Sequence, residues 1–310
     1  MDADDEEGAR DPYYIRTSAA GSDIRRLVAK CDDAFLVADQ HGDFPDLPES
    51  EFGLYVGGTR FLRSLELAVH GQRPLSLSAA VAADGQGVAV DLTNPDLGHG
   101  EIVVLRGRTL RLARRLELTP TGLDQVLTVE SFNPTPHELV LAWHYASDFA
   151  DVFEVRGMIR ERRGDLLPPV VESGAACLAY RGLDGVVRAT TLAFTPTPEK
   201  VTAGFARHRL VILPGEAIEL RLRISTREDD ARRAPRTATA HAPAPEPPVR
   251  VQSANAAFDA WITRAWADLT MLTTETPHGR IAYAGIPWFV APFGRDSLIT
   301  ALQHLPFDPG

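Results

Sequence analysis

The stretch Leu110–Leu118 reads LRLARRLEL and decides the class of fold. Leu110 and Leu112 alternate with Arg111, so one side of the segment is apolar and the other is charged. This period of two is typical of a β-strand with one buried and one solvated face. The stretch Leu220–Ile224, LRLRI, has the same period. The arginines of these stretches are therefore interpreted as the solvated face of a sheet, and they need no functional explanation.

Similar segments follow one another from Asp33 to Ser225, and turn signals such as Gly57–Gly58 and Asn133–Pro136 separate them. No helical period of useful length lies between them. The expected strands are Ala34–Asp39, Gly53–Val56, Arg60–His70, Leu75–Ala82, Val88–Thr93, Ile102–Leu105, Leu110–Leu118, Gln125–Phe132, Glu138–Tyr145, Cys177–Arg181, Val186–Phe194, Arg207–Leu213 and Ile218–Ser225. This pattern predicts a mainly β fold, a large antiparallel β-sandwich.

The bulk properties of the 310-residue chain are those of a soluble globular protein. Hydrophobic residues make up 44% and charged residues 24%, the net charge is −10 and the pI is about 5.4. Because phosphate binding needs a basic surface, neither nucleic acid nor an anionic membrane is expected as a partner. The acidic N-terminus, MDADDEEGARD, is unlike a signal peptide, and no apolar run approaches the ~18 residues of a membrane span. A cytoplasmic location is expected.

Common catalytic and metal-binding motifs are missing from the sequence. Cys31 and Cys177 are the only cysteines, and the nine histidines show no metal-ligand spacing. The chain also lacks a P-loop and the G-x-G-x-x-G, G-x-S-x-G and H-E-x-x-H patterns. We therefore expect no metal, no other cofactor and no serine nucleophile.

Composition divides the chain into four parts. Residues 1–29 are expected to form an N-terminal arm that begins with about a dozen disordered residues, and residues 30–226 to form the β-sandwich domain. Residues 227–250, which contain HAPAPEPPVR, are typical of a Pro- and Ala-rich linker. Residues 251–310 are expected to begin a helical domain.

An apolar stripe at helical spacing predicts a helix from about Asn255 to Thr274. Trp261 and Trp266 both lie on this stripe, which indicates that they belong to a core shared with a sizeable partner. Pro277–Gly279 is expected to end the helix. A helix, a turn and part of a second helix cannot enclose their own apolar face, so this domain is expected to be incomplete. The stripe consists of Phe258, Trp261, Ile262, Ala265, Trp266, Leu269 and Leu272.

The stretch Gly285–Leu302, GIPWFVAPFGRDSLITAL, is the main candidate for a binding site. Trp288 and Phe293 form an aromatic wall near the Arg295–Asp296 pair, which looks buried at the start of a helix. Carboxylate and guanidinium groups bind hydroxyl pairs and flat rings cover the C–H faces of sugars, so the arrangement suits a polyhydroxylated ligand. In the alternative interpretation, Asp296 or Ser297 caps the helix, Arg295 is a loop residue and the aromatic rings belong to the core.

A second candidate site is a cluster of three carboxylates, Asp148, Asp151 and Glu154. These three are close enough in sequence to place two carboxyl groups roughly 5–10 Å apart, as a glycoside hydrolase requires. The alternative is a solvated bend between strands in which Arg156 neutralises one of the carboxylates. Arg60, which follows Gly57–Gly58–Thr59, is interpreted as a charge at a strand end that pairs with a neighbour.

Four motifs together resemble bacterial amylo-α-1,6-glucosidases, the glycogen-debranching type. Three of them resemble the N-terminal β domain of these proteins, and the last resembles the start of the catalytic barrel that follows. The resemblance covers most of the chain from about Lys30 onward and departs from the family at Gly58, where members usually have an acidic residue. The motifs are FGLYVGGTRFLRSLEL (52–67), VDLTNPDL (90–97), DFADVFEVRG (148–157) and AGIPWFVAPFGRDSLITALQ (284–303).

The resemblance implies a β supersandwich joined to an (α/α)6 barrel and hydrolysis of α-glucosidic bonds by inversion. It implies that Arg295 and Asp296 contact the glucose at the non-reducing end of an α-glucan, with Trp288 or Phe293 as wall residues. The general acid and base of the family are expected beyond residue 310, so no catalytic residue is assigned here.

In the leading interpretation, the chain is the N-terminal portion of an α-glucan-acting glycoside hydrolase. It is expected to be inactive alone. The barrel is then either truncated early or completed by another chain. One alternative is a free-standing carbohydrate-binding β-sandwich. Another is an interaction scaffold. The Trp261/Trp266 stripe is expected to dock the missing barrel or to mediate self-association.

Overall fold

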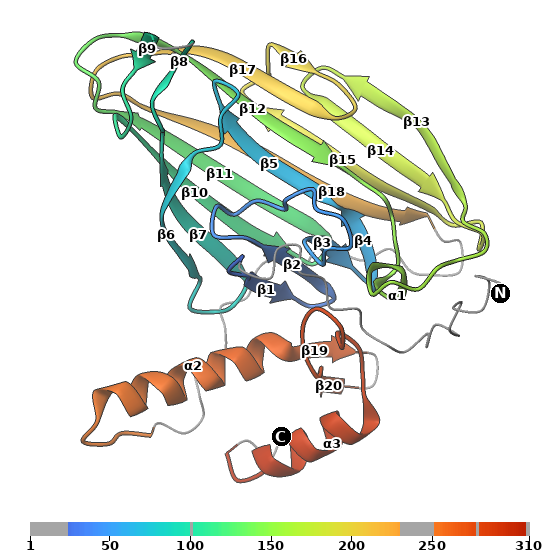
Figure 1. The fold of residues 1–310 in the computed structure, drawn as a ribbon. Coiled ribbons are helices and arrows are strands. Elements are labelled where there is room, and N and C mark those ends of the chain that lie inside the picture. Colours follow the sequence, from blue (N-terminus) through green and yellow to red (C-terminus); the bar gives the residue numbers. More distant parts are fainter. Residues whose placement is uncertain (1–23, 100–101, 230–250, 277–278, 308–310) are drawn as a thin grey trace, which may run out of the picture.

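The computed structural model describes residues 24–99, 102–229, 251–276 and 279–307, and these form a two-layered β-sandwich followed by a helical segment (Figure 1). One layer is an antiparallel sheet of eight strands in the order β13-β14-β15-β18-β11-β10-β7-β6. Its strands are β6 (Leu75–Val81), β7 (Gly87–Thr93), β10 (Leu110–Thr119), β11 (Gly122–Ser131), β13 (Asp165–Glu172), β14 (Ala175–Arg181), β15 (Val187–Thr195) and β18 (Ala217–Asp229).

Two antiparallel sheets of four strands pack on the eight-stranded sheet and form the second layer. The first has the order β1-β2-β3-β4, and the second has the order β16-β17-β12-β5. Their strands are β1 (Leu27–Cys31), β2 (Ala34–Ala38), β3 (Gly53–Val56), β4 (Thr59–Leu62), β5 (Ser64–Val69), β12 (His137–Ala146), β16 (Lys200–Val201) and β17 (Phe205–Ile212). A small hairpin, β8 (Leu97–His99) and β9 (Ile102–Leu105), lies at one end. The predicted antiparallel β-sandwich is therefore confirmed.

The core lies between the two layers and consists mainly of the inward-facing residues of each strand. In β10, Leu110, Leu112 and Leu116 are buried and Arg111 is exposed, as the alternation predicts. Trp143 of β12 is 1% exposed and packs against Phe194 of β15, with ring centroids 5.8 Å apart. Burial of each such side chain contributes about 1.5–3 kcal/mol to the stability of the sandwich.

Several expectations about the strands and their boundaries need correction. The sandwich is longer at both ends than predicted, because β1 begins at Leu27, inside the expected arm, and β18 runs to Asp229, inside the expected linker. Residues 60–70 do not form one strand: the chain breaks at Arg63, and β4 and β5 belong to different sheets. The edge strand β13 was not predicted because Pro168 and Pro169 interrupt its pattern, and a bulge between Leu167 and Val170 accommodates them. By contrast, Gly57–Gly58 forms the predicted hairpin turn, with φ of +57° and +82°.

The inward face of β10 also carries a charge. Arg114 is fully buried, and its guanidinium donates to the carboxylate of Asp43 at 2.5 Å and to the side-chain oxygen of Gln125 at 2.9 Å. Asp43 in turn binds Arg73, which also contacts Asp39. This network ties the segment after β2 to the centre of the eight-stranded sheet.

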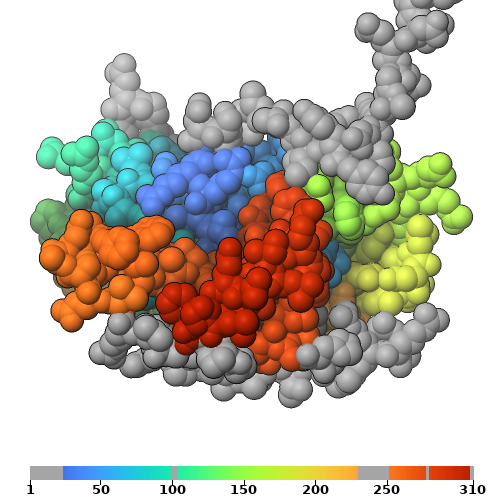
Figure 2. All heavy atoms as spheres, turned by 90° about the horizontal axis from the view of Figure 1, so that it is seen from below, coloured from blue at the N-terminus to red at the C-terminus, as the bar shows by residue number. Residues whose placement is uncertain are grey.

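The helical segment consists of α2 (Ala256–Leu272), the hairpin β19 (Thr273–Thr276) and β20 (Gly279–Ala282), and α3 (Gly294–His304). It lies across one end of the sandwich, where its orange and red residues adjoin the blue N-terminal strands (Figure 2). Asn255 caps α2 by accepting from the backbone N–H groups of Ala257 and Phe258. The helix therefore begins as predicted. It ends at Leu272, before the expected stop, and continues into the unpredicted hairpin.

Lys30 joins the sandwich to the helical segment. Its side chain is fully buried, and Nζ donates to the carbonyl of Met271 at 3.0 Å and to the hydroxyl of Thr274 at 2.6 Å. The ammonium group also lies 5.0 Å from the centre of the Tyr283 ring, whose hydroxyl donates to Asp33. The last turn of α2 is thus held by the first strand of the sandwich.

Several sequence expectations concern residues outside this description. The disorder predicted at the N-terminus and most of the linker, at residues 230–250, lie outside the described residues. In the described part of the chain, no helix is long and apolar enough to cross a membrane. Within the same residues, no cluster of three or more His, Cys, Asp or Glu side chains could hold a metal ion.

Candidate functional site

The aromatic residues of the C-terminal stretch lie on and beside a turn. Gly285 and Phe289 form a β-bridge around a cis peptide bond at Ile286–Pro287. Trp288 is half-buried and packs against the core of the sandwich, so its position is fixed by the β domain. Phe289 and Phe293 meet edge to face at 5.5 Å and are 40% and 39% exposed. The rings of Phe289 and Phe293 therefore remain accessible, whereas Trp288 packs against the sandwich.

Arg295 and Asp296 lie in the first turn of α3, and both side chains are exposed. The predicted burial of this pair is therefore wrong. Neither residue makes an ion pair or a side-chain hydrogen bond with any other described residue. A guanidinium and a carboxylate beside two exposed rings thus have free hydrogen-bonding groups, which is what binding of a polyhydroxylated ligand requires.

The capping interpretation of Asp296 and Ser297 is also wrong. Helix α3 begins at Gly294, and Phe293 occupies the N-cap position without a side-chain cap. The hydroxyl of Ser297 instead donates to the carbonyl of Ala282 at 2.8 Å and ties α3 to β20. Sequence reasoning placed the N-cap three or four residues late because Gly294, a poor helix former, opens the helix.

Asp148 pairs with Arg60, as expected for a charge at a strand end. Arg60 is 7% exposed and donates to both carboxylate oxygens of Asp148, at 3.2 and 2.5 Å. It also donates to the carbonyl of Ser50 at 2.7 Å. Arg60 therefore joins three separate segments of the sandwich and has a structural role.

Asp151 and Glu154 form a capping box at the short helix α1 (Val152–Val155). The carboxylate of Asp151 accepts from two backbone N–H groups of the helix and from Arg160 at 2.5 Å. Glu154 accepts from the backbone N–H of Asp151 at 2.9 Å and pairs with Arg163 at 2.9 Å. The predicted bend is therefore a capped turn, and arginines other than the expected Arg156 neutralise its carboxylates.

Arg156 has a different role that the sequence did not indicate. Its guanidinium lies 5.8 Å from the ring centre of Phe153 and 5.6 Å from that of Phe289. Since Phe289 belongs to the aromatic turn, α1 of the β domain contacts the candidate binding site directly. The motifs at 148–157 and 284–303 thus meet in space.

A second feature of the helical segment is an apolar pocket of about 520 Å³ beside α3. Leu269 of α2, Ile281 of β20 and Phe293 are among the residues that line it. It adjoins Trp266, which stacks on His304 with ring centres 5.0 Å apart. Trp261, by contrast, is 62% exposed, so the described residues leave this part of the predicted apolar stripe uncovered.

The described residues thus define a class of protein, an antiparallel β-sandwich domain whose end carries a helical segment with an exposed aromatic and Arg–Asp cluster. Residues 30–223 match the sequence model of a family described as the N-terminal domain of some glycogen debranching enzymes. This match covers more than half of the chain, and the protein belongs to that family.

The comparison with solved structures finds distant similarity to sugar-acting proteins. A structure described as a kojibiose phosphorylase from the human microbiome matches with a TM-score of 0.46 and 8% identity over 66% of this chain. The match spans only 30% of that phosphorylase. An aldose 1-epimerase-type protein from Escherichia coli K12 matches 66% of this chain and 99% of its own, with a TM-score of 0.35 and 9% identity. A galactose mutarotase-like protein from Clostridium acetobutylicum matches 65% of this chain and 94% of its own, with a TM-score of 0.37 and 10% identity. A search of curated proteins found no match.

Proposed function

We propose that this chain is the N-terminal portion of an α-glucan-acting glycoside hydrolase of the amylo-α-1,6-glucosidase type. Membership of the debranching-enzyme N-terminal family supports this proposal. The observation that carries it is the pair Arg295 and Asp296, exposed in the first turn of α3 with unused hydrogen-bonding groups. In this proposal, residues 30–226 are the β-sandwich domain and residues 251–310 begin an (α/α)6 barrel.

The proposed ligand is a glucose unit of an α-glucan. Asp296 accepts hydrogen bonds from two neighbouring hydroxyls, and Arg295 donates to a hydroxyl or ring oxygen. The exposed ring of Phe293 covers a C–H face of the sugar. Trp288 is half-buried against the sandwich core, and its part is to hold the aromatic wall in place.

We also propose that the chain alone does not hydrolyse glucan. An inverting glycosidase needs one carboxylic acid that donates a proton and a second carboxylate that activates water. The carboxylates of the 148–154 cluster are all engaged: Asp148 by Arg60, Asp151 by Arg160 and Glu154 by Arg163. Each of these carboxylates is thus committed to a contact within the protein, and none is left free to act on a glycosidic bond.

Binding of maltooligosaccharide to the purified chain tests the first proposal. We expect measurable binding by isothermal titration calorimetry and a loss of about tenfold or more in D296A and in R295A, because each loses charge-assisted hydrogen bonds. The variants E117A and R115A are matched controls, since both residues are exposed on the solvated face of β10. Absence of binding, or equal affinity in D296A and E117A, would contradict the proposed site. Release of glucose from glycogen would contradict the proposed inactivity.

The apolar faces of α2 and α3 support a related proposal, that further barrel helices cover them. Trp261 is 62% exposed, Leu298 is 71% exposed and Leu302 is 68% exposed. Exposed apolar surface of this kind favours association. We expect the chain to self-associate at micromolar concentration in sedimentation velocity, and W261S/L302S to sediment more nearly as a monomer. A wild-type chain that sediments purely as a monomer would contradict the expected self-association.

A further inference from the structure

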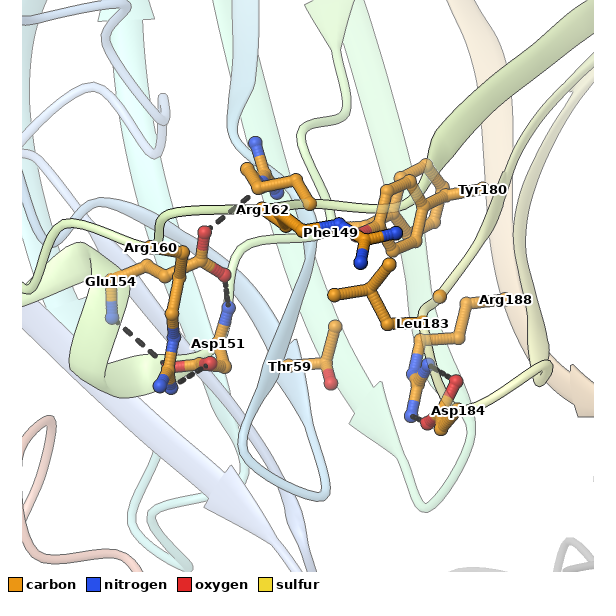
Figure 3. A pocket seen from close by; sticks show the side chains of 12 residues that line it. Thr59, Phe149, Asp151, Glu154, Arg160, Arg162, Tyr180, Leu183, Asp184 and Arg188 are labelled. Atoms are coloured by element: carbon orange, nitrogen blue, oxygen red, sulfur yellow. Dashed lines mark hydrogen bonds and ion pairs between the residues drawn. The ribbon is translucent and has the colours of Figure 1, made fainter.

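A second pocket, about 310 Å³ in volume, lies on the β domain beside α1 (Figure 3). One wall comes from α1 and the segment that follows it, with Arg160 and Arg162. The opposite wall comes from the β14–β15 hairpin, with Asp184 and Arg188, and Thr59, the first residue of β4, lies between them. The volume is sufficient for a compact small molecule.

Charged side chains of both signs line this pocket. Four guanidinium groups and three carboxylates face it, and Glu228, which is not part of the lining, also pairs with Arg188. The lining groups are Arg160, Arg162, Arg163, Arg188, Asp151, Glu154 and Asp184. A guanidinium group that has no carboxylate partner in a concave site favours an anionic ligand.

The carboxylates serve to fix the guanidinium groups. The backbone of α1 holds Asp151 and Glu154 in a capping box, and these two carboxylates hold Arg160 and Arg163. On the opposite wall, Asp184 accepts from the backbone N–H of Val186 at 3.0 Å and pairs with Arg188 at 2.8 Å. Each guanidinium has five N–H donors, and these contacts use only some of them. The remaining donors are therefore available and already oriented.

Arg162 is the guanidinium that no carboxylate neutralises. It is exposed, and it forms no ion pair or side-chain hydrogen bond with the other residues that the structure describes.

The aromatic residues of the pocket, in contrast, are not accessible to a ligand. Phe149 and Tyr180 stack on each other at 5.7 Å and are 3% and 9% exposed, and the guanidinium of Arg163 lies over Tyr180. A sugar ring therefore has no free aromatic face on which to stack. Leu183, which is 62% exposed, provides an apolar rim.

From these contacts we infer that the pocket binds a small phosphate ester, with the phosphate held by Arg162 together with Arg160 and Arg188, and the organic part against Leu183. Guanidinium groups match the geometry of phosphate oxygens and form short charge-assisted hydrogen bonds with them. This site is separate from Arg295 and Asp296, and the inference does not depend on the proposed glucan binding.

The test is calorimetric titration of the full 310-residue chain at low ionic strength with glucose 6-phosphate, inorganic phosphate and glucose. We expect glucose 6-phosphate to bind and glucose to leave the pocket empty. We expect R162A to weaken the binding by about tenfold, the effect of losing one charge-assisted contact. Arg162 makes no contact that holds the fold, so R162A is expected to fold normally. R115A, which removes an exposed arginine from β10, is the control and should bind like the wild type.

A further variant separates an ester from a simple anion. L183S is expected to weaken glucose 6-phosphate and to leave inorganic phosphate unaffected. Equal affinities for inorganic phosphate and for the ester would overturn the assignment of an organic ligand. Absence of phosphate-dependent binding, or binding in R162A equal to that in R115A, would overturn the site itself.

Discussion

Titration of Lys30 is expected to make the protein more stable as the pH rises from 7 to 9.5. Burial lowers the pKa of this ammonium from 10.5 to about 8, although Asp32, Asp33 and Cys31 oppose the shift. Between these two pKa values the unfolded chain binds more protons at Lys30 than the folded protein does. Stability therefore increases with pH in this window and is lowest below pH 8, where the buried lysine is charged.

The magnitude follows from the two pKa values. One pKa unit corresponds to about 1.4 kcal/mol, so the full effect is about 3 kcal/mol, of which about 2 kcal/mol develops between pH 7 and pH 9.5. Cys31 acts in the opposite direction. Burial raises the pKa of its thiol from 9.0 to about 11, so the folded state retains a proton that the unfolded state loses. This thiol removes about 1 kcal/mol over the same range.

Urea unfolding followed by tryptophan fluorescence measures these effects. In wild-type protein, the free energy of unfolding should rise by about 1 kcal/mol from pH 7 to pH 9.5. In C31A the rise should be about 2 kcal/mol, because the opposing thiol is absent. In C31A/K30M the free energy should be independent of pH over this range. A rise in C31A/K30M as large as that in C31A would refute the assignment of the effect to Lys30.

Buried and exposed charges should respond differently to mutation. D43A is expected to lower the free energy of unfolding by about 3–5 kcal/mol, because it leaves the fully buried Arg114 without its carboxylate. The matched control D124A breaks an exposed pair and should lower the free energy of unfolding by less than about 1 kcal/mol in a urea titration. Equal losses of stability in D43A and D124A would show that burial of Arg114 does not matter. G53A should lower the free energy of unfolding by about 2–4 kcal/mol, and the melting temperature should fall accordingly. The reason is that Gly53 has a φ of +142° and that a Cβ there would lie 2.6 Å from a backbone oxygen. An unchanged melting temperature in G53A would contradict that conformation.

The sequence predicted the sheet better than it predicted the side chains that hold the sheet together. Alternation along β10 and β18 depends on local spacing, and both strands are present, although β18 extends to Asp229 and so into the predicted linker. The partner of Arg114 is Asp43, which is 71 residues away, and no local pattern connects them. Similarly, the split at Arg63 depends on pairing of β5 with β12, which begins 73 residues after β5 begins.

The candidate site shows the same limit. The sequence predicted aromatic side chains near Arg295 and Asp296, and Phe289 and Phe293 lie in contact there with partly exposed rings. The exposure of Arg295 and Asp296 was not predictable, because it depends on which surfaces of α3 meet β20. The contact between Arg156 and Phe289 was also missed, since it joins segments that lie 133 residues apart.

The contact of Lys30 with Met271 and Thr274 has a consequence for biosynthesis. Every strand of the sandwich precedes residue 230, so the β domain can assemble on the ribosome before all of α2 has emerged. During that interval the Lys30 ammonium has no helix end to bind, because its partners lie 241 and 244 residues later in the chain. The loss of its hydration is thus deferred to a late docking step, after the sheets have already closed.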